Sequence, residues 1–265
     1  MKNLMGFFCI FSLLLINCCA SRQIGNGFTV GGNTGTNSGW PVTIPGGATA
    51  NLNLEQQSGW TTDASSSISP NPPTSYAIVP TGGGGSTMTL QTANTANDYA
   101  GWMAKLTVGT TSGQLHFLIR SSFTFSSVSG IQAWEIGRRA TNNAQVTDNG
   151  QTQLVPIGGG QLEFDIVPSS SGGWVDTGIR FPMFVIGTTY NEELYYIADT
   201  SGGLSLEYVM INGALYPIPS NLQNVAGAIQ MPSWGANEMV VAFQPDIKPL
   251  GTAYNAVVTM NAWTW

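Results

Sequence analysis

The stretch Gln114–Phe125, QLHFLIRSSFTF, decides the fold class of this chain. Its large apolar residues recur at every second position, apart from Leu118: Leu115, Phe117, Ile119, Phe123 and Phe125. Because successive side chains of a β-strand point to opposite faces, this alternation predicts a strand with one face in a core. Polar residues between them fall on the other face: His116, Arg120, Ser122 and Thr124.

The same alternation recurs further along the chain, at Gln161–Val167, Leu204–Ile211 and Tyr254–Trp265. In the first of these the inward residues are Leu162, Phe164 and Ile166. In the second, one apolar face is expected from Leu204, Leu206, Tyr208 and Met210. The dipeptide Asn212-Gly213 favours a type I′ hairpin turn, so residues 214–216 are predicted to return as the next strand.

Shorter stretches predict further strands, and no convincing helix is found after residue 20. These strands are Phe28–Val30, Val42–Ile44, Ala50–Leu54, Tyr76–Val79, Gly101–Val108, Ile131–Gly137, Gly178–Ile186, Leu194–Ala198 and Met239–Phe243. Short strands with frequent turns and no crossover helices predict an all-β fold, an antiparallel β-sandwich of jelly-roll type, of which a concanavalin-like sandwich is one form. We expect a single domain over residues 21–265 with a Gly/Ser-rich N-terminal section, in which Gly82–Gly85 is a loop.

The first twenty residues predict export. Lys2 precedes a short apolar run over residues 5–16, and Ala20 ends a segment whose small residues suit a signal peptidase. Cleavage after Ala20 would give a secreted chain without cysteine. The alternative is a lipid anchor at Cys18 or Cys19, because the residues before Cys18 resemble a bacterial lipobox. The expected location is extracellular or on the cell surface, which for a lipoprotein includes the outer membrane.

The low content of charged residues limits the kinds of molecule that this protein is expected to bind. Only 8% of the residues are charged, against about 25% in ordinary soluble domains, while 42% are hydrophobic and can form a core. Eight basic residues and a net charge of −6 exclude a phosphate-binding stripe, so no nucleic-acid partner is expected. A surface of Ser, Thr, Asn and Gln suits uncharged partners. These are carbohydrate, another surface polymer, or further copies of the same chain.

Three of the eight tryptophans are candidate ligand contacts because Gly or Ser flanks them: Trp60, Trp174 and Trp234. Indole rings in loops can stack on sugar rings while amides bind the hydroxyls. Trp263 and Trp265 are instead expected to pack at the end of the last strand. The leading hypothesis is non-catalytic binding of neutral carbohydrate or another surface ligand. The alternative is a structural subunit of a surface layer, fibre or matrix.

A third hypothesis is catalytic. In the segment 163–168, EFDIVP, alternation puts Glu163 and Asp165 on one face. The segment resembles part of the signature of laminarinase-like jelly-roll hydrolases, in which Glu, Asp and a second Glu alternate along a strand. The resemblance implies glycoside hydrolysis by a pair of carboxyl groups. The second Glu is absent, since Val167 or Pro168 stands in its place.

Two further glutamates, Glu135 and Glu207, lie beside aromatic residues. Pairs of this kind on antiparallel strands also occur in cellulase-like jelly rolls, so Glu135 and Glu207 are weaker catalytic candidates. His116, the only histidine, has no partner pattern for a nucleophile or a zinc site. No calcium-loop spacing is present either, so the sequence predicts neither a metal site nor a cofactor.

Overall fold

The computed structural model describes these parts of the chain: residues 23–24, 28–29, 40, 42–54, 61–63, 75–80, 86–91, 98–99, 101–107, 115–126, 131–142, 145–168, 171, 173–198, 204–225, 238–247 and 254–265. Within them the strands form two eight-stranded sheets and a two-stranded ribbon, and every named strand pairing is antiparallel. No helix in these parts has the length and apolar character that a bilayer crossing needs.

Sheet I contains the strand with the clearest alternation, β9 (Leu115–Phe125). Its order is β16 (Ala214–Pro217), β15 (Leu204–Ile211), β14 (Thr189–Ala198), β9, β18 (Tyr254–Thr264), β6 (Ser86–Gln91) and β5 (Ser75–Pro80), with β3 (Thr49–Asn51) beside β18.

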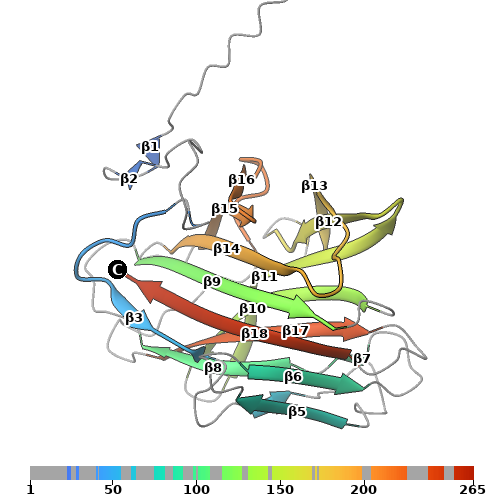
Figure 1. Ribbon diagram of the computed structural model, residues 1–265. Coiled ribbons are helices and arrows are strands. Elements are labelled where there is room, and N and C mark those ends of the chain that lie inside the picture. Colours follow the sequence, from blue (N-terminus) through green and yellow to red (C-terminus); the bar gives the residue numbers. More distant parts are fainter. Residues whose placement is uncertain are drawn as a thin grey trace, which may run out of the picture.

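Sheet II lies behind sheet I in Figure 1. Its order is β13 (Val175–Pro182), β12 (Gln161–Ile166), β11 (Gln145–Gly158), β10 (Ile131–Asn142), β17 (Glu238–Ile247), β8 (Gly101–Thr107) and β4 (Thr61–Asp63), with β7 (Asp98–Tyr99) beside β17. The remaining strands, β1 (Gln23–Ile24) and β2 (Phe28–Thr29), pair with each other.

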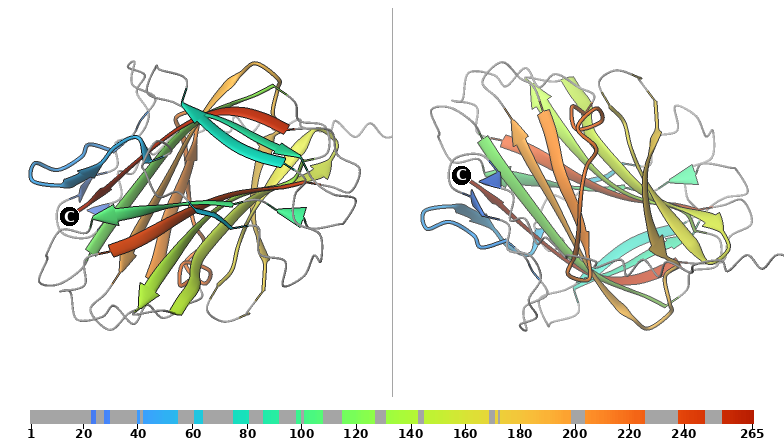
Figure 2. Two further views of the ribbon diagram at one scale, coloured as in Figure 1. Left: turned by 90° about the horizontal axis from the view of Figure 1, so that it is seen from below. Right: turned by 90° about the horizontal axis from the view of Figure 1, so that it is seen from above.

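The core lies between the two sheets, which Figure 2 gives from below and from above. At its centre Phe123 and Phe125 of β9 meet Trp134 of β10, with ring centroids 4.6 and 4.9 Å apart. The inward residues predicted on β9 and β12 are buried there, because their alternation gives each strand one apolar face. The antiparallel β-sandwich of jelly-roll type is thus confirmed.

A second hydrophobic cluster lies on the outer face of sheet I. Trp40, Val42 and Ile44 lie on that face, where Val42 is buried against Leu118 of β9 and Tyr195 of β14, whereas Leu54 at the end of the same segment belongs to the core. Trp263 and Trp265 pack against the same cluster, as the sequence predicted for the end of the last strand. Part of the outer face of sheet I is therefore covered by the segment that begins at Trp40.

Arg120 is the polar centre of this covered face. Its guanidinium carbon lies 5.0 and 5.1 Å from the ring centroids of Trp40 and Trp263. Its Nε donates to Oε2 of Glu193 and its Nη2 to the carbonyl oxygen of Val42, both at 2.6 Å. The segment that begins at Trp40 is thereby held against sheet I by ring stacking and by hydrogen bonds.

The prediction of one apolar face along β15 is wrong in its second half. Leu204 and Leu206 belong to the core, but Tyr208 and Met210 lie in the second cluster. The register with β14 slips at Glu207, so that alternation changes face there. The hairpin turn that follows is confirmed, because Asn212 and Gly213 both have positive φ, at 50° and 81°.

Other strand predictions also differ from the structure, and some strands, β4 and β6 among them, were not predicted. Residues 42–44 are not a strand, although Val42 is buried. The strand predicted over 178–186 starts earlier and ends at Pro182, after which the chain turns at Ile186 and Gly187. Strand β11 was missed, because Asn149-Gly150 and Pro156 interrupt its alternation.

Candidate ligand-binding site

Strand β12 carries two carboxylates on the outer face of sheet II. Leu162, Phe164 and Ile166 are buried in the core, so Glu163 and Asp165 between them point away from it. The shared face predicted from their alternation is therefore confirmed, while no finding tests their role.

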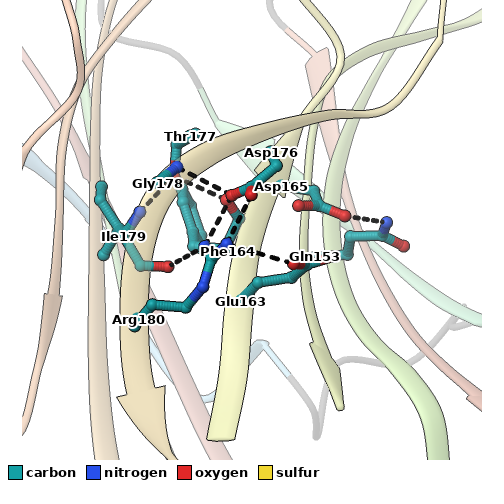
Figure 3. A network of polar contacts seen from close by, with 9 residues as sticks. All are labelled: Gln153, Glu163, Phe164, Asp165, Asp176, Thr177, Gly178, Ile179 and Arg180. Atoms are coloured by element: carbon teal, nitrogen blue, oxygen red, sulfur yellow. Dashed lines mark hydrogen bonds and ion pairs between the residues drawn. The ribbon is translucent and has the colours of Figure 1, made fainter. Parts of the chain in front are cut away.

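The two neighbouring strands add three polar side chains at the same place. Asp165 pairs with Gln153 of β11 and with Asp176 of β13, while Glu163 pairs with Arg180 of β13. We call these five residues the polar cluster; Figure 3 shows their side chains gathered on one side of the strands. Gln153, Asp176 and Arg180 were not predicted from the sequence, because only strand register brings them to β12.

A bulge in β13 brings Asp176 and Arg180 together. Glu163 and Asp165 are two residues apart on β12, but their partners Arg180 and Asp176 are four residues apart on β13. Gly178 lies between those partners and has a φ of +80°. In a regular strand, residues four apart are separated by about 13 Å, so without the bulge the side chains of Asp176 and Arg180 would not be neighbours. The bulge is fixed by two hydrogen bonds: the Gly178 amide donates to Oδ1 of Asp176 at 2.8 Å, and the Thr177 hydroxyl donates to the Phe164 carbonyl at 2.6 Å. Gly178, the first residue of the predicted strand, is the one sequence signal that could have indicated this bulge.

Arg180 holds Asp176 with both arms of its guanidinium. Nη1 and Nη2 donate to Oδ1 and Oδ2 of Asp176 at 2.7 and 2.5 Å. These hydrogen bonds lower the pKa of Asp176 to about 2. Nη2 also lies 3.5 Å from Oε2 of Glu163. Asp176 is therefore ionised at any ordinary pH, and Arg180 neutralises it.

Asp165 is buried but only half satisfied. Its side chain is 6% exposed, and its Oδ2 accepts a hydrogen bond of 2.9 Å from Nε2 of Gln153. Its Oδ1 is buried with no hydrogen-bond partner among the described residues. Burial raises the pKa of Asp165. A buried acceptor without a donor costs about 1–3 kcal/mol, so a donor from outside the described structure would be stabilising here.

Trp174 stands next to the polar cluster in the chain. It directly precedes β13, its side chain is 39% exposed, and it lies two residues before Asp176. Alternation along an extended segment puts both on the same side. The other two predicted contacts, Trp60 and Trp234, lie outside the described residues.

The polar cluster also contains a set of possible metal ligands. Glu163, Asp165 and Asp176 each offer one carboxylate oxygen, and these oxygens all lie within 4.8 Å of one another. Carboxylate oxygens are what Ca²⁺ and similar hard cations prefer. The sequence predicted no metal site because the three ligands come from two strands with no loop spacing. The guanidinium of Arg180 is already present among these oxygens.

The weaker catalytic candidates do not come together. Glu135 belongs to sheet II, where its backbone pairs with Gln153, and its side chain lies outside the described part. Glu207 belongs to sheet I and accepts a hydrogen bond of 2.7 Å from Ser205. Because β10 and β15 are in different sheets, the pair expected on neighbouring strands is not formed.

His116 is held by its neighbours on the outer face of sheet I. Its Nδ1 and the Tyr195 hydroxyl share a hydrogen bond of 2.6 Å, and its ring stacks on Trp265 at 5.4 Å. Burial lowers its pKa. These contacts give His116 a structural role in packing the outer face of sheet I.

Comparison with known proteins gives matches in structure but none in sequence. No family model matches the chain, and no curated protein matches its sequence. Among solved structures, peanut lectin with a 9-mer peptide is 13% identical and has a TM-score of 0.45, over 77% of this chain and 96% of that chain. The globular domain of T. cruzi calreticulin is 8% identical and has a TM-score of 0.48, over 81% and 88%. Winged bean acidic lectin complexed with methyl-α-D-galactose is 7% identical and has a TM-score of 0.46, over 82% and 98%.

Proposed function

We propose that this protein is an exported, non-catalytic binding module for neutral carbohydrate. Its ligand would lie on the outer face of sheet II, over the polar cluster and Trp174. The described side chains at that place offer both a hydrogen-bonding part and an apolar part to such a ligand.

The observation that carries the proposal is the unsatisfied oxygen of Asp165. Oδ1 is a buried acceptor with no donor among the described residues, while Oδ2 is fixed by Gln153. A sugar hydroxyl can donate to this oxygen and accept from a neighbouring N–H group at the same time. Such a hydroxyl would relieve the cost of the unpaired acceptor, which gives the site a preference for ligands rich in hydroxyl groups.

Trp174 supplies the apolar part of the same site. An exposed indole offers a flat face to the C–H side of a sugar ring, and polar groups beside it orient the hydroxyls. Charge supports a neutral ligand, since Arg180 already neutralises Asp176 and the whole chain is only 8% charged. A strongly anionic ligand would meet Glu163 and Asp165 and be repelled.

Glycoside hydrolysis is a second candidate function, favoured by the spacing of the carboxylates. Oxygens of Glu163, Asp165 and Asp176 lie within 4.8 Å, close to the roughly 5 Å separation of retaining glycosidases. Asp176 is unsuited to donate a proton, because its pKa is about 2. Glu163 and Asp165 both have raised pKa values, mainly through desolvation, and are better suited than Asp176 to donate a proton.

The test is retention on polysaccharides combined with detection of released sugar. The purified protein is screened against soluble and insoluble neutral polysaccharides and a glycan array. Trp174→Ala is expected to weaken binding about tenfold, since one stacking contact is lost. Asp165→Asn presents an amide N–H in place of the open acceptor and is expected to weaken binding at least as much.

Two matched variants serve as controls on the other sheet. Glu207→Gln makes the same carboxyl-to-amide change in sheet I, and Val257→Ala truncates an exposed apolar side chain of β18. Both should bind like the wild type. Sugar release that Glu163→Gln abolishes would favour the hydrolase instead. Absence of any glycan binding, together with concentration-dependent assembly, would favour the structural subunit.

A further inference from the structure

Among the described residues, the positive charge beside the carboxylates of Glu163, Asp165 and Asp176 is the guanidinium of Arg180. Arg180 donates two parallel hydrogen bonds to Asp176 and lies 3.5 Å from Oε2 of Glu163. Such forked guanidinium–carboxylate contacts are among the strongest ion pairs in proteins. Both oxygens of Asp176 are therefore already engaged by a positive charge.

The same place has the geometry of a divalent-cation site. Each of the three carboxylates contributes an oxygen within 4.8 Å of the others. Oδ1 of Asp165 is buried, has no donor in the part of the chain that the structure describes, and is turned away from Gln153 (Figure 3). Calcium binds such oxygens at about 2.3–2.6 Å. A dication at that distance would compete with Arg180 for Asp176 and would be repelled by the guanidinium.

We propose that Arg180 takes the place of a metal ion in the polar cluster. Ligand binding at this face, which rests on the function proposed above, then needs no divalent cation. Removing the guanidinium frees Oδ2 of Asp176, leaves only the Gly178 amide as a donor to Oδ1, and leaves three carboxylates without a counter-charge. The remaining oxygens then form a divalent-cation site that the wild type does not offer.

Two substitutions separate the charge of Arg180 from its shape. Arg180→Gln removes the positive charge and keeps an amide donor, whereas Arg180→Lys keeps the charge and loses the fork. Chelator-treated wild type and both variants are titrated with CaCl₂ and with MnCl₂ by isothermal calorimetry, and their Tm is measured with and without the cation. We expect R180Q to bind cation at least tenfold more tightly than the wild type and to gain Tm, whereas R180K should behave like the wild type.

The double variant Asp176→Asn with Arg180→Gln tests whether the new cation lies in the cluster. It lacks one of the three carboxylates and should lose most of the affinity that R180Q gains. Equal affinity in the single and double variants would place the cation elsewhere and overturn the proposal.

Measurements on the wild type test the proposal even if the R180Q variant does not fold. Under the proposal, chelator changes neither its Tm nor its retention on a glycan, and calcium or manganese gives no binding below about 1 mM. Cation binding by the wild type within tenfold of R180Q overturns the proposal, as does a folded R180Q that binds no more tightly. A wild type that retains no glycan contradicts the proposed function alone, because the cation titrations do not depend on it.

Discussion

Glu192 of β14 is a carboxyl group buried in the core side of sheet I. Its side chain is 2% exposed, with Oε2 3.4 Å from the hydroxyl of Ser121 on β9. Burial raises its pKa from 4.5 to about 8, so the folded protein keeps it protonated at neutral pH. Neither the alternation of β14 nor its composition indicated a buried acid, because Glu192 and Glu193 form a polar pair in the sequence.

This carboxyl group should make the stability of the protein fall with rising pH. Between about pH 4.5 and pH 8 the folded state holds a proton that the unfolded chain has released. Relative to Glu192→Gln, the wild type is expected to lose about 3–5 kcal/mol of unfolding free energy across this window, with no further loss above it. Urea unfolding at several pH values measures the difference. Glu207→Gln on the neighbouring strand is the control, and parallel pH profiles for wild type and E192Q would refute the assignment.

Only part of the polar cluster could be predicted from the sequence. Alternation correctly put Glu163 and Asp165 on one face, because that property is local to β12. Asp176 and Arg180 reach the same place only through the register of β13 and its bulge. Pairing of strands depends on the whole core, so no pattern within residues 161–182 could have assigned these two residues to the site.

Among the strands, β13 is the one whose irregularity matters most for the site. Gly178 has a φ of +80°, where a Cβ would meet no other atom within 4 Å but the backbone itself is strained for an L-residue. Gly178→Ala is therefore expected to cost about 1–2 kcal/mol of stability and to weaken glycan binding by loosening the pair between Asp176 and Arg180. Denaturant unfolding and the polysaccharide assay measure the two effects.

Gly173 provides the matched control for that substitution. It precedes the same strand, and a Cβ there would also meet open space, but its φ is not positive. Gly173→Ala should change stability by less than about 0.5 kcal/mol. Equal effects at the two glycines would show that the left-handed backbone at Gly178 is not what holds the bulge.

The strands that the sequence predicted well are those with unbroken alternation. β9 and β18 lie side by side in sheet I and were expected within a residue of their observed ends. β11 was missed because its turn-like residues fall inside a long strand, where a register shift accommodates them. In β15 a similar register shift at Glu207 moved the apolar residues after it from the core face of sheet I to the outer face. Bulges therefore account for the errors at β11 and β15, since they break the two-residue period from which strands are predicted.

In the protein as a whole, the two outer faces have different roles. The outer face of sheet I is partly covered by Trp40, Val42 and Ile44 and carries Arg120, which binds this segment, whereas the outer face of sheet II carries the polar cluster and, beside it, the exposed Trp174. Trp40 lies on the side of sheet I, where its ring stacks on the guanidinium of Arg120.

This division predicts that the two faces can be altered independently. Trp40→Ala removes one ring from the pair that holds Arg120 and is expected to cost about 2 kcal/mol of stability, less than the roughly 3–5 kcal/mol of a fully buried tryptophan, with glycan binding unchanged. Trp174→Ala should weaken binding with little change in stability, since its side chain is exposed. Because the sites are on opposite sheets with no shared partner among the described residues, the double variant should show the sum of both effects within about 0.5 kcal/mol. Unfolding curves and binding isotherms on all four proteins measure this, and a coupling above about 1 kcal/mol would mean that the covered face supports the site through the core.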